Sequence, residues 1–575
     1  MKKRKVFSLI WHYLKDQKLK LILYIILVIL TFLPTIFIPY IWGHATEYLL
    51  SGNFEKFVQC LIIWEGIYIL LYTVVQLIRD KIYNFLEITF QKRVSKDLYT
   101  KVMNLPAIAF EEIGVGEFIN RIYHDPDRVI ELLARLIKMI CKLMVAIIVF
   151  FILFKTSIII GLEILIFALI MGYISYKYLP KIRKVQENIK DNTDKFLKSS
   201  TENITGIREI KGLGIKQIIN NRTFKELDNI SVQLAKQKDY DATYYSLNNF
   251  IYYILQFIIL LSTGYLLTQG RITYAIFVMI ESYLWRLDDV VESISDFGSN
   301  YNKVLVSLKR IDEIVNNRLY KDEKFGTKNL DNIKGTVELK NVYFKYREDE
   351  DNTLDGLSMI LKPNIKNAII GRSGNGKTTI FNLLLRYFDT TKGEILIDGV
   401  NIKELTEQSL RNNISIIRQN PFLFNMSIFE NFKIVKQDVT IEEVKRVCKM
   451  SYIDEYIESL PKKYDTIIGE GGVNLSGGQK QRLKIAIALL LDTKIILFDE
   501  ATSALDNESQ EYIKKTIDNL VKDHTVIIVA HRLSTIIDSD VIHIIDKGKL
   551  GGIGTHDELI KTNQIYKKLY ETENK

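Results

Sequence analysis

A glycine-rich segment in the second half of the chain has the residue types and spacing that bind phosphate. It reads GRSGNGKTT and directly follows the short apolar stretch Asn367–Ile370. The segment satisfies G-x-x-x-x-G-K-[ST] in the strand–loop–helix setting that this pattern requires. Glycines let backbone N–H groups converge on phosphate oxygens at a helix N-terminus, while Lys377 reaches the outer phosphates and the Thr378 hydroxyl binds Mg²⁺. The predicted phosphate-binding residues are Gly371, Arg372, Ser373, Gly374, Asn375, Gly376, Lys377, Thr378 and Thr379.

Two adjacent carboxylates follow about 120 residues later, at the end of the apolar run KIILFDE. A buried strand would bring Asp499 beside the phosphates, where a carboxylate holds Mg²⁺ through water. Glu500, one residue farther, is placed to orient the attacking water as a general base. The two motifs together predict hydrolysis of a nucleoside triphosphate, ATP, with Mg²⁺.

The segment LSGGQ, Leu475–Gln479, lies between these two motifs. In isolation it reads as a turn that opens a helix, with Ser476 as the cap and QKQRLKIAIALLL at helical period after it. The pentapeptide also resembles the signature of ABC (ATP-binding cassette) ATPases. Three further segments are similar to that family's motifs: Gln419 in IIRQNPFLF resembles the Q-loop, Ser503–Asp506 (SALD) the D-loop, and His531 in VAHRLST the switch histidine.

The resemblance implies a role for each matching residue. Glu500, His531 and Gln419 would act in catalysis, and Thr378, Gln419 and Asp499 would hold Mg²⁺. Tyr346, 25 residues before Gly371, stands where the family places a ring that stacks on adenine. Two cassettes would bind head to tail, so that one cassette's Walker loop and the other's signature enclose ATP. The signature residues that would bind ATP are Ser476, Gly477, Gly478 and Gln479.

The chain departs from the family pattern at two positions. Gly471 and Ile487 stand where relatives commonly have arginine. Neither position touches ATP in the family's scheme, so the departures concern signalling between cassettes rather than hydrolysis.

The elements around these motifs predict an α/β domain at 336–575, because strand-like runs such as TVELKNVYFKY alternate with helical ones. The polar segment at 316–335 reads as a linker. The part before it, 1–315, is different, because all the long uncharged runs of the chain lie there.

A hydrocarbon core of ~30 Å requires about 20 helical residues. Four predicted spans are strongly apolar: Leu21–Thr46, Phe57–Ile78, Ser157–Tyr178 and Leu247–Gly270. Two more, Ala134–Phe154 and Ile272–Ile294, carry several charges. The start of the chain, MKKRK before an apolar stretch, resembles a signal peptide, but the first run is too long and no A-x-A-like site follows.

The distribution of basic residues supports six spans with both termini in the cytosol. With six spans the three outer loops hold one basic residue each, Lys56, Lys155 and Arg271, whereas fourteen lie from Lys177 to Lys238. The two inner segments exceed fifty residues and have apolar periodicity, so we expect helical extensions of the spans into the cytosol. These segments resemble the intracellular loops of exporter-type half-transporters, which implies cassette contacts near Glu112–Glu117 and Arg208–Gly214.

The expected architecture is therefore a multi-domain chain: an all-α six-helix transmembrane domain followed by an α/β P-loop ABC ATPase domain. The expected function is ATP-driven export across the cytoplasmic membrane. The formal charge of +9 follows membrane topology and does not indicate nucleic-acid binding. Cys60, Cys141 and Cys448 lie too far apart for a zinc site or a disulfide framework. About 20 residues precede the first span, none of them Cys, which disfavours a leader-cleaving peptide exporter.

Several alternatives stay open at this point. A soluble ABC ATPase is disfavoured by the spans, and an importer by their fusion to a cassette, but an ATP-gated channel or receptor is not excluded. Because Glu500 and LSGGQ are both retained, we expect a homodimer rather than a pair with a second chain.

Two charged stripes bear on the cargo, which we expect to be an amphipathic drug, a mature peptide or a lipid. An acidic stripe in span six, with Glu65 and Glu163, would favour cationic cargo; its members are Glu281, Trp285, Asp288 and Glu292. A basic stripe in span three would instead hold a lipid phosphate, as in an anionic-lipid flippase; its members are Arg135, Lys138 and Lys142. The stripes could also pair with each other or lie beyond the bilayer.

Overall fold

The computed structural model describes residues 4–316, 320, 323–347, 351–419, 421–469, 471–499, 507–530 and 536–573. Within these ranges the side chains of 4–8, 111, 285–303, 507, 509 and 573 lie outside the description. The chain forms two compact units. One comprises Met1–Met103 and Gly114–Tyr320, and the other Asn104–Ile113 and Lys321–Lys575. Each unit is considered by itself below.

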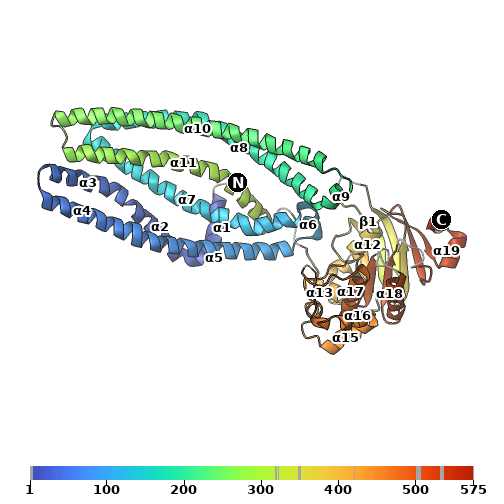
Figure 1. Ribbon diagram of the computed structural model, residues 1–575. Coiled ribbons are helices and arrows are strands. Elements are labelled where there is room, and N and C mark those ends of the chain that lie inside the picture. The colour runs from blue at the N-terminus through green and yellow to red at the C-terminus, as the bar shows by residue number, and fades with distance from the viewer. Residues whose placement is uncertain are drawn as a thin grey trace. The chain divides into compact units, whose positions relative to one another are not determined.

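The first unit is helical throughout its described residues (Figure 1). Its helices are α1 (Arg4–Leu14), α2 (Lys18–Phe32), α3 (Pro34–Leu50), α4 (Phe54–Tyr68), α5 (Gln76–Met103), α7 (Val115–Thr156), α8 (Ile158–Thr205), α9 (Ile207–Gly212), α10 (Lys216–Thr268) and α11 (Tyr274–Val315). A π-helical segment, Ile69–Val75, joins α4 to α5. Pro34 starts α3 directly after α2, because proline fits the first turn of a helix, where its missing N–H is not needed.

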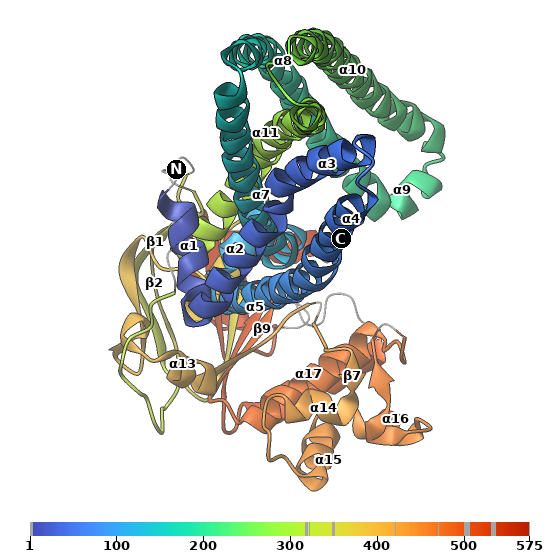
Figure 2. The same cartoon turned by 90° about the vertical axis from the view of Figure 1, so that its left-hand side faces the viewer.

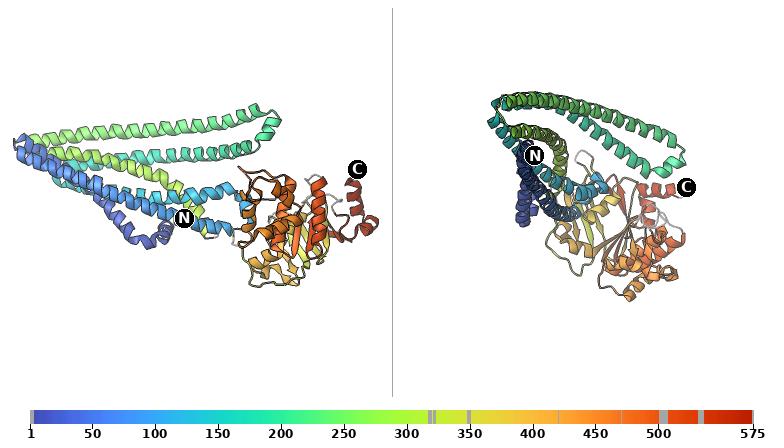
Figure 3. Two further views of the ribbon diagram at one scale, coloured as in Figure 1. Left: turned by 60° about the horizontal axis from the view of Figure 1, so that its bottom comes forward. Right: turned by 60° about the vertical axis from the view of Figure 1, so that its left-hand side comes forward.

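Five helical stretches are long and apolar enough to cross a membrane: Leu9–Leu50, Phe54–Met103, Val115–Thr156, Ile158–Thr205 and Lys216–Thr268. These cover the first five predicted spans except for Ser157 at the start of one and Gln269 and Gly270 at the end of another. The sixth predicted span falls in α11, whose described apolar part is Tyr274–Leu284. The helices α8 and α10 continue without a break beyond the predicted spans, α8 to Thr205 and α10 from Lys216. That these extensions lie in the cytosol stays a prediction. Figure 3 shows α8 and α10 side by side over this length.

Close backbone contact and buried polar bonds hold the helices of this unit together. A Cβ placed on Gly43 of α3 would lie 2.3 Å from the Ala275 carbonyl oxygen of α11. The Tyr283 hydroxyl of α11 donates to the Ile36 carbonyl oxygen of α3 over 2.5 Å. Glycine at 43 therefore allows α3 and α11 to approach within a distance that a side chain would prevent.

The second unit is an α/β domain with two main sheets. The larger sheet has the strand order β12-β11-β3-β10-β9-β6, and only its edge strand β12 is antiparallel. Its strands are β3 (Lys366–Ile370), β6 (Ile414–Ile417), β9 (Ile495–Asp499), β10 (Thr525–Val529), β11 (Val541–Asp546) and β12 (Lys549–Gly554). The smaller sheet is antiparallel in the order β2-β1-β4-β5, with strands β1 (Val337–Phe344), β2 (Leu354–Leu361), β4 (Lys392–Ile397) and β5 (Val400–Asn401).

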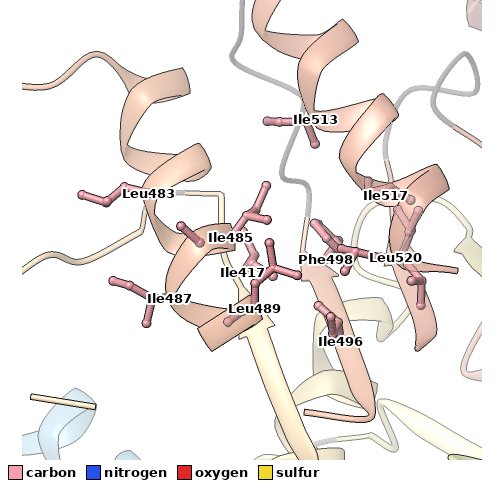
Figure 4. Packing of buried hydrophobic residues seen from close by; sticks show 14 of the residues in the cluster. Ile417, Leu483, Ile485, Ile487, Leu489, Ile496, Phe498, Ile513, Ile517 and Leu520 are labelled. Carbon is pink, nitrogen blue, oxygen red and sulfur yellow. The ribbon is translucent and has the colours of Figure 1, made fainter. Parts of the chain in front are cut away.

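A helical subdomain lies beside α17 (Gly477–Leu491), as Figure 2 shows. It comprises α14 (Ile428–Lys433), α15 (Ile441–Met450) and α16 (Asp454–Ser459). Figure 4 shows α17 and α18 (Asn507–Leu520) turning apolar side chains toward β6 and β9. Phe498 of β9 and Ile485 of α17 are both fully buried in this core. The core thus fixes α17, which starts at the LSGGQ segment, against the strand that ends at Asp499.

The predicted fold class is confirmed: a helical membrane domain precedes an α/β domain. The segment expected as a linker, 316–335, is bound to the α/β domain over its second half. Gly326 N–H donates to the Leu405 carbonyl oxygen over 2.8 Å, and Lys328 N–H to that of Glu404 over 2.9 Å. The segment Asn104–Ile113 belongs to the same compact unit and contains α6 (Ala107–Ile113). It includes Glu112 and Ile113, the first two residues of the predicted contact Glu112–Glu117. Arg208–Gly214 belongs to the first unit.

Candidate nucleotide-binding site

The predicted catalytic and phosphate-binding segments follow parallel strands that end at one edge of the larger sheet. Asp499 of β9 pairs with Val529 of β10, and Val529 pairs with Ile369 of β3. Phe498 pairs with Ile417 of β6, two residues before Gln419. Neighbouring strands lie about 4.8 Å apart, so the chain leaves this edge at three closely spaced points. The fold therefore brings the Walker loop, Asp499 and Gln419 together, as open α/β sheets do at ligand sites.

The loop between β3 and α12 (Lys377–Leu384) depends on glycine at two positions where the backbone is left-handed, Gly374 with φ +84° and Gly376 with φ +88°. A Cβ on Gly376 would also lie 2.7 Å from Leu354 Cδ2. A different restriction applies at Gly371, where a Cβ would lie 2.2 Å from the Ile545 carbonyl oxygen of β11. The loop can therefore wrap closely around an anion only with glycine at these places.

Lys377 is buried at the start of α12 and points back over the loop. Its Nζ donates to the carbonyl oxygens of Gly371 over 2.8 Å and Arg372 over 3.1 Å. Asn375 Nδ2 holds the loop to the sheet by donating to the Ile545 carbonyl oxygen over 3.0 Å. A buried ammonium group inside a ring of backbone amides at a helix N-terminus fits the phosphates of ATP in charge and in geometry.

Tyr346 lies beside the same loop. Its hydroxyl forms a 2.9 Å hydrogen bond with the Thr379 hydroxyl, and its ring meets those of Phe344 and Phe388 edge-on at 4.9 and 5.3 Å between centroids. The side chain is 36% exposed. The structure thus brings Tyr346 to the nucleotide loop, and its stacking on adenine stays a prediction.

The LSGGQ segment forms a helix N-terminus, as its residue types predict. Ser476 caps α17, with its Oγ accepting from Gln479 N–H over 3.3 Å and its own N–H donating to Gln479 Oε1 over 2.8 Å. The dipole of this 15-residue helix and the N–H groups of its first turn favour a negative charge at Ser476–Gly478.

The residues present fit Mg²⁺ as the metal. Thr378, Asp499 and Gln419 offer oxygen atoms, which a hard cation prefers, and Mg²⁺ usually takes few protein ligands besides water and phosphate. Among the described residues no cluster of three or more His, Cys, Asp or Glu could hold a metal by itself. Glu500, His531 and Ser503–Asp506 lie outside the described residues, although β9 and β10 end directly before Glu500 and shortly before His531.

Sequence reasoning missed one contact of a predicted residue, Asn375, and one further residue, Gln481, that position the site. Asn375 anchors the Walker loop through a backbone acceptor, and no spacing rule reveals such a bond. Gln481 is 1% exposed on α17, and its Nε2 donates to the Gln419 carbonyl oxygen over 2.9 Å. The signal for Gln481 was a polar residue on the buried face of an otherwise apolar helix.

The two departures from the family pattern have different surroundings. Ile487 is 7% exposed and belongs to the apolar core under α17, where a charged group would need a partner. Gly471 has φ +81° and a Cβ there would meet nothing within 4 Å, so its left-handed backbone rather than crowding favours glycine.

The charged stripes of the membrane unit are only partly described. Arg135 donates to Glu131 on its own helix over 2.6 Å, and Lys138 is exposed. Glu163 of α8 accepts from Ser262 of α10 over 2.6 Å. The side chains of Trp285, Asp288 and Glu292 lie outside the described residues. Charge on Arg135 is therefore balanced within one turn of its own helix.

The comparisons with known proteins agree with this geometry. Residues 354–503 match the family "ABC transporter", and residues 21–285 match "ABC transporter transmembrane region". The Bacillus subtilis (strain 168) protein YgaD, named as a multidrug export ATP-binding/permease protein, is 31% identical over 479 residues, 83% of this chain and 82% of that protein. The ATP-dependent lipid A-core flippase of Haemophilus influenzae (strain 86-028NP) is 32% identical over 476 residues, 82% of this chain and 81% of that protein.

A solved structure has the same fold. It is that of a bacterial Atm1-family ABC exporter with ATP bound, with a TM-score of 0.80 and 24% identity, covering 97% of this chain and 98% of that one. At this identity the likeness establishes the arrangement of the chain and not its cargo. The fold, the nucleotide loop and these relatives lead to one conclusion. The chain belongs to the ABC transporter family, as a multi-pass membrane ATPase with a fused membrane domain and cassette that couples ATP hydrolysis to export.

Proposed function

We propose that the working unit is a homodimer with two competent ATP sites, lying in the cytoplasmic membrane with both termini in the cytosol. The observation that carries this proposal is that one cassette has two separate phosphate-binding elements, the Walker loop and the signature. We call each of them a half-site, because each would supply one side of an ATP site. The Walker loop ends at the N-terminus of α12, and the signature at that of α17, and the first turn of each helix directs backbone N–H groups toward that end. Two copies arranged head to tail would join one of each around every ATP.

Within such a site each half-site has its own role. Lys377 would exchange its two carbonyl acceptors for β- and γ-phosphate oxygens, and Thr378, Gln419 and Asp499 would hold Mg²⁺, which neutralises charge that develops on the phosphates. Ser476, the N–H groups of Gly477 and Gly478, and the side chain of Gln479 would bind the γ-phosphate of the nucleotide held by the partner. Glu500 would take the proton of the attacking water, with His531 placing the γ-phosphate.

Closure of the two cassettes is the step that ATP drives. Because both half-sites bind the γ-phosphate, ATP binds the closed dimer more tightly than the open one, and this difference shifts the population toward closure. The cassette unit includes Asn104–Ile113 between two membrane helices, α5 and α7, so a movement of the cassette is transmitted to both. Hydrolysis removes the bridging phosphate and allows reopening.

The experiment uses the purified full chain, alone, in lipid nanodiscs. We expect a dimer that hydrolyses ATP, and a Glu500→Gln variant that binds ATP and accumulates as a closed dimer with little turnover. A monomer without hydrolysis would contradict the homodimer and favour an essential partner chain. Lys377→Ala is the control, because it should abolish nucleotide binding in a protein that still folds.

A lipid flippase is the second candidate, favoured by the relatives that are named lipid A-core flippases. For that function the basic stripe of α7 would hold a lipid phosphate. Arg135 is already paired with Glu131, which leaves the exposed Lys138 as the stronger phosphate ligand. Stimulation of ATP hydrolysis by anionic lipids that is lost in Lys138→Gln would support this candidate over export of a cationic compound.

A further inference from the structure

Four aromatic rings form a continuous row on two neighbouring helices of the membrane unit. Trp64 and Tyr68 of α4 have ring centroids 6.2 Å apart, and Tyr68 stacks on Tyr72 at 5.0 Å. Trp42 of α3 meets Trp64 edge-on at 4.6 Å. Residues four apart share one face of a helix, so the rings follow one line along α4 and its π-helical continuation. We call Trp42, Trp64, Tyr68 and Tyr72 the aromatic row.

The aromatic row lies too deep to be an interfacial belt. Trp64 and Tyr68 stand roughly 15–21 Å along the helix from its start at Phe54, at a rise of 1.5 Å per residue. The hydrocarbon core is ~30 Å thick, and belts of Trp and Tyr occupy its two boundaries. Because indole N–H and phenol O–H groups in mid-membrane need hydrogen-bond partners, this face is suited to a hydrated path and not to lipid.

The protein covers the aromatic row only in part. Trp64 Nε1 is buried and has no hydrogen-bond acceptor among the described residues. Trp64 and Tyr68 are half-buried, whereas Ile62 and Ile69, on another face, are 67% and 62% exposed. The helix therefore has an apolar face suited to lipid and a partly covered aromatic face with an unsatisfied donor. The π-helical segment Ile69–Val75 continues this line, and such segments frequently occur at functional sites.

The charges near the aromatic row favour a cation. From Pro34 to Ile78 the acidic residues are Glu47, Glu55 and Glu65, against one basic residue, Lys56, and His44. Glu65 directly follows Trp64 and is exposed. At the outer end of the same hairpin Lys56 Nζ already lies 5.2 Å from the centre of the Tyr48 ring. Ring faces attract cations by about 0.5–2 kcal/mol, more strongly where water is excluded.

We propose that the aromatic row is a cargo-binding surface for organic cations with an aromatic or apolar body. The rings stack on the body and face the positive charge, and Glu65 supplies the countercharge. This inference rests on the export function proposed above and names the class of cargo for it.

Tetraphenylphosphonium and tetraphenylborate, two ions of the same shape and opposite charge, test this proposal. Binding of each ion to the full-length protein in nanodiscs is measured without ATP, after subtraction of uptake by empty nanodiscs. We expect the cation to bind about tenfold or more tightly than the anion, since a cation–π contact joined to a countercharge contributes at least ~1.4 kcal/mol. Glu65→Gln should weaken binding of the cation and leave that of the anion unchanged.

Three ring variants separate a binding role from a structural one. Tyr68→Leu and Trp64→Leu should each weaken binding of tetraphenylphosphonium several-fold, whereas Tyr68→Phe, which keeps the ring, should bind within about twofold of wild type. Tyr173→Leu is the matched control, because Tyr173 is a 64% exposed ring on α8 away from the aromatic row. Its binding should be unchanged.

Equal or tighter binding of the anion would overturn the proposal, as would unchanged binding of the cation in both leucine variants. Since binding is measured without ATP, this result does not depend on hydrolysis. Absence of ATP hydrolysis in the wild-type protein would contradict the proposed function. The role of the aromatic row would still be decided by the comparison of the two ions.

Discussion

Gln481, on the helix that begins at the LSGGQ segment, donates a hydrogen bond from Nε2 to the backbone carbonyl oxygen of Gln419 over 2.9 Å. The bond ties the start of α17 to the loop that carries a predicted Mg²⁺ ligand. It connects the half-site for the partner's nucleotide with the half-site for the chain's own nucleotide. We infer that this bond keeps the two half-sites in register within one cassette.

Replacing Gln481 by leucine tests that role. The change removes one hydrogen bond, about 0.5–1.5 kcal/mol, and also removes Oε1, a buried acceptor without a partner among the described residues. We therefore expect thermal stability near that of wild type and ATP affinity within about twofold, with kcat for ATP hydrolysis reduced several-fold. Unchanged kcat in a folded variant would show that the bond has only a packing role.

Tyr346 offers a matched pair of variants at the nucleotide site. Stacking of a base on an aromatic ring contributes about 1–3 kcal/mol, so Tyr346→Ala should weaken ATP binding by tens-fold or less and leave kcat at saturating ATP largely intact. Tyr346→Phe keeps the ring and removes only the bond to Thr379, so its affinity should stay close to wild type. Nucleotide binding measured by titration decides the matter, and equal affinity in Tyr346→Ala would show that the ring does not contact adenine.

The packing of α3 on α11 predicts opposite effects for two glycines. Gly43→Ala would place a Cβ 2.3 Å from a backbone oxygen, and backbone cannot give way as a side chain can, so we expect destabilisation of about 1–3 kcal/mol. Gly66→Ala on α4 meets nothing within 4 Å and should be neutral or stabilising by up to about 1 kcal/mol, because alanine favours helix. Thermal unfolding in one detergent compares the two. Equal melting temperatures would contradict the close approach of α3 and α11.

Acid should destabilise the cassette through His543. This residue of β11 is fully buried, both ring nitrogens lack hydrogen-bond partners among the described residues, and burial lowers its pKa to about 4. Unfolded histidine titrates near 6.5, so between pH 6.5 and 4 the unfolded state binds the extra proton and stability falls as pH falls. From pH 7.5 to 5.5 we expect a loss of about 1–2 kcal/mol from this group.

His543→Leu isolates that effect. The variant has no ring to protonate, so its melting temperature should fall less between pH 7.5 and 5.5 than that of wild type. An identical pH dependence in the two proteins would contradict this, because it would mean that His543 has the same pKa in the folded and unfolded states.

The parts of the molecule that depend on local chemistry could be predicted from the sequence. Gly376 has a left-handed backbone, which favours glycine, and Ser476 caps a helix. Both lie where the phosphate-binding pattern and the LSGGQ segment predict a loop and a helix start. Long apolar runs and basic inner segments likewise predicted the helices and their extensions. These signals involve residues within a few positions of each other.

Contacts between distant segments could not be predicted in this way. The bonds from Asn375 to Ile545 and from Gln481 to Gln419 join residues 170 and 62 positions apart, and neither leaves a periodic trace. The segment after Glu323 looked like a linker because it is polar, yet its backbone pairs with Glu404 and Leu405. The aromatic row was missed for a similar reason, since Trp42 and Trp64 meet only because α3 and α4 fold back on each other.

In the proposed dimer each ATP site joins the Walker loop of one chain to the signature of the other, and mixed dimers distinguish this arrangement from a site within one chain. All chains carry Glu500→Gln, and dimers with two different tags are purified. One dimer pairs a Lys377→Ala chain with a Ser476→Phe chain; the other pairs a chain with both substitutions with a chain that has neither. We expect about one occluded ATP per dimer in the first case, where one site is intact, and close to none in the second, where each site has one defect. Equal occlusion in both dimers, or more in the second, would contradict it.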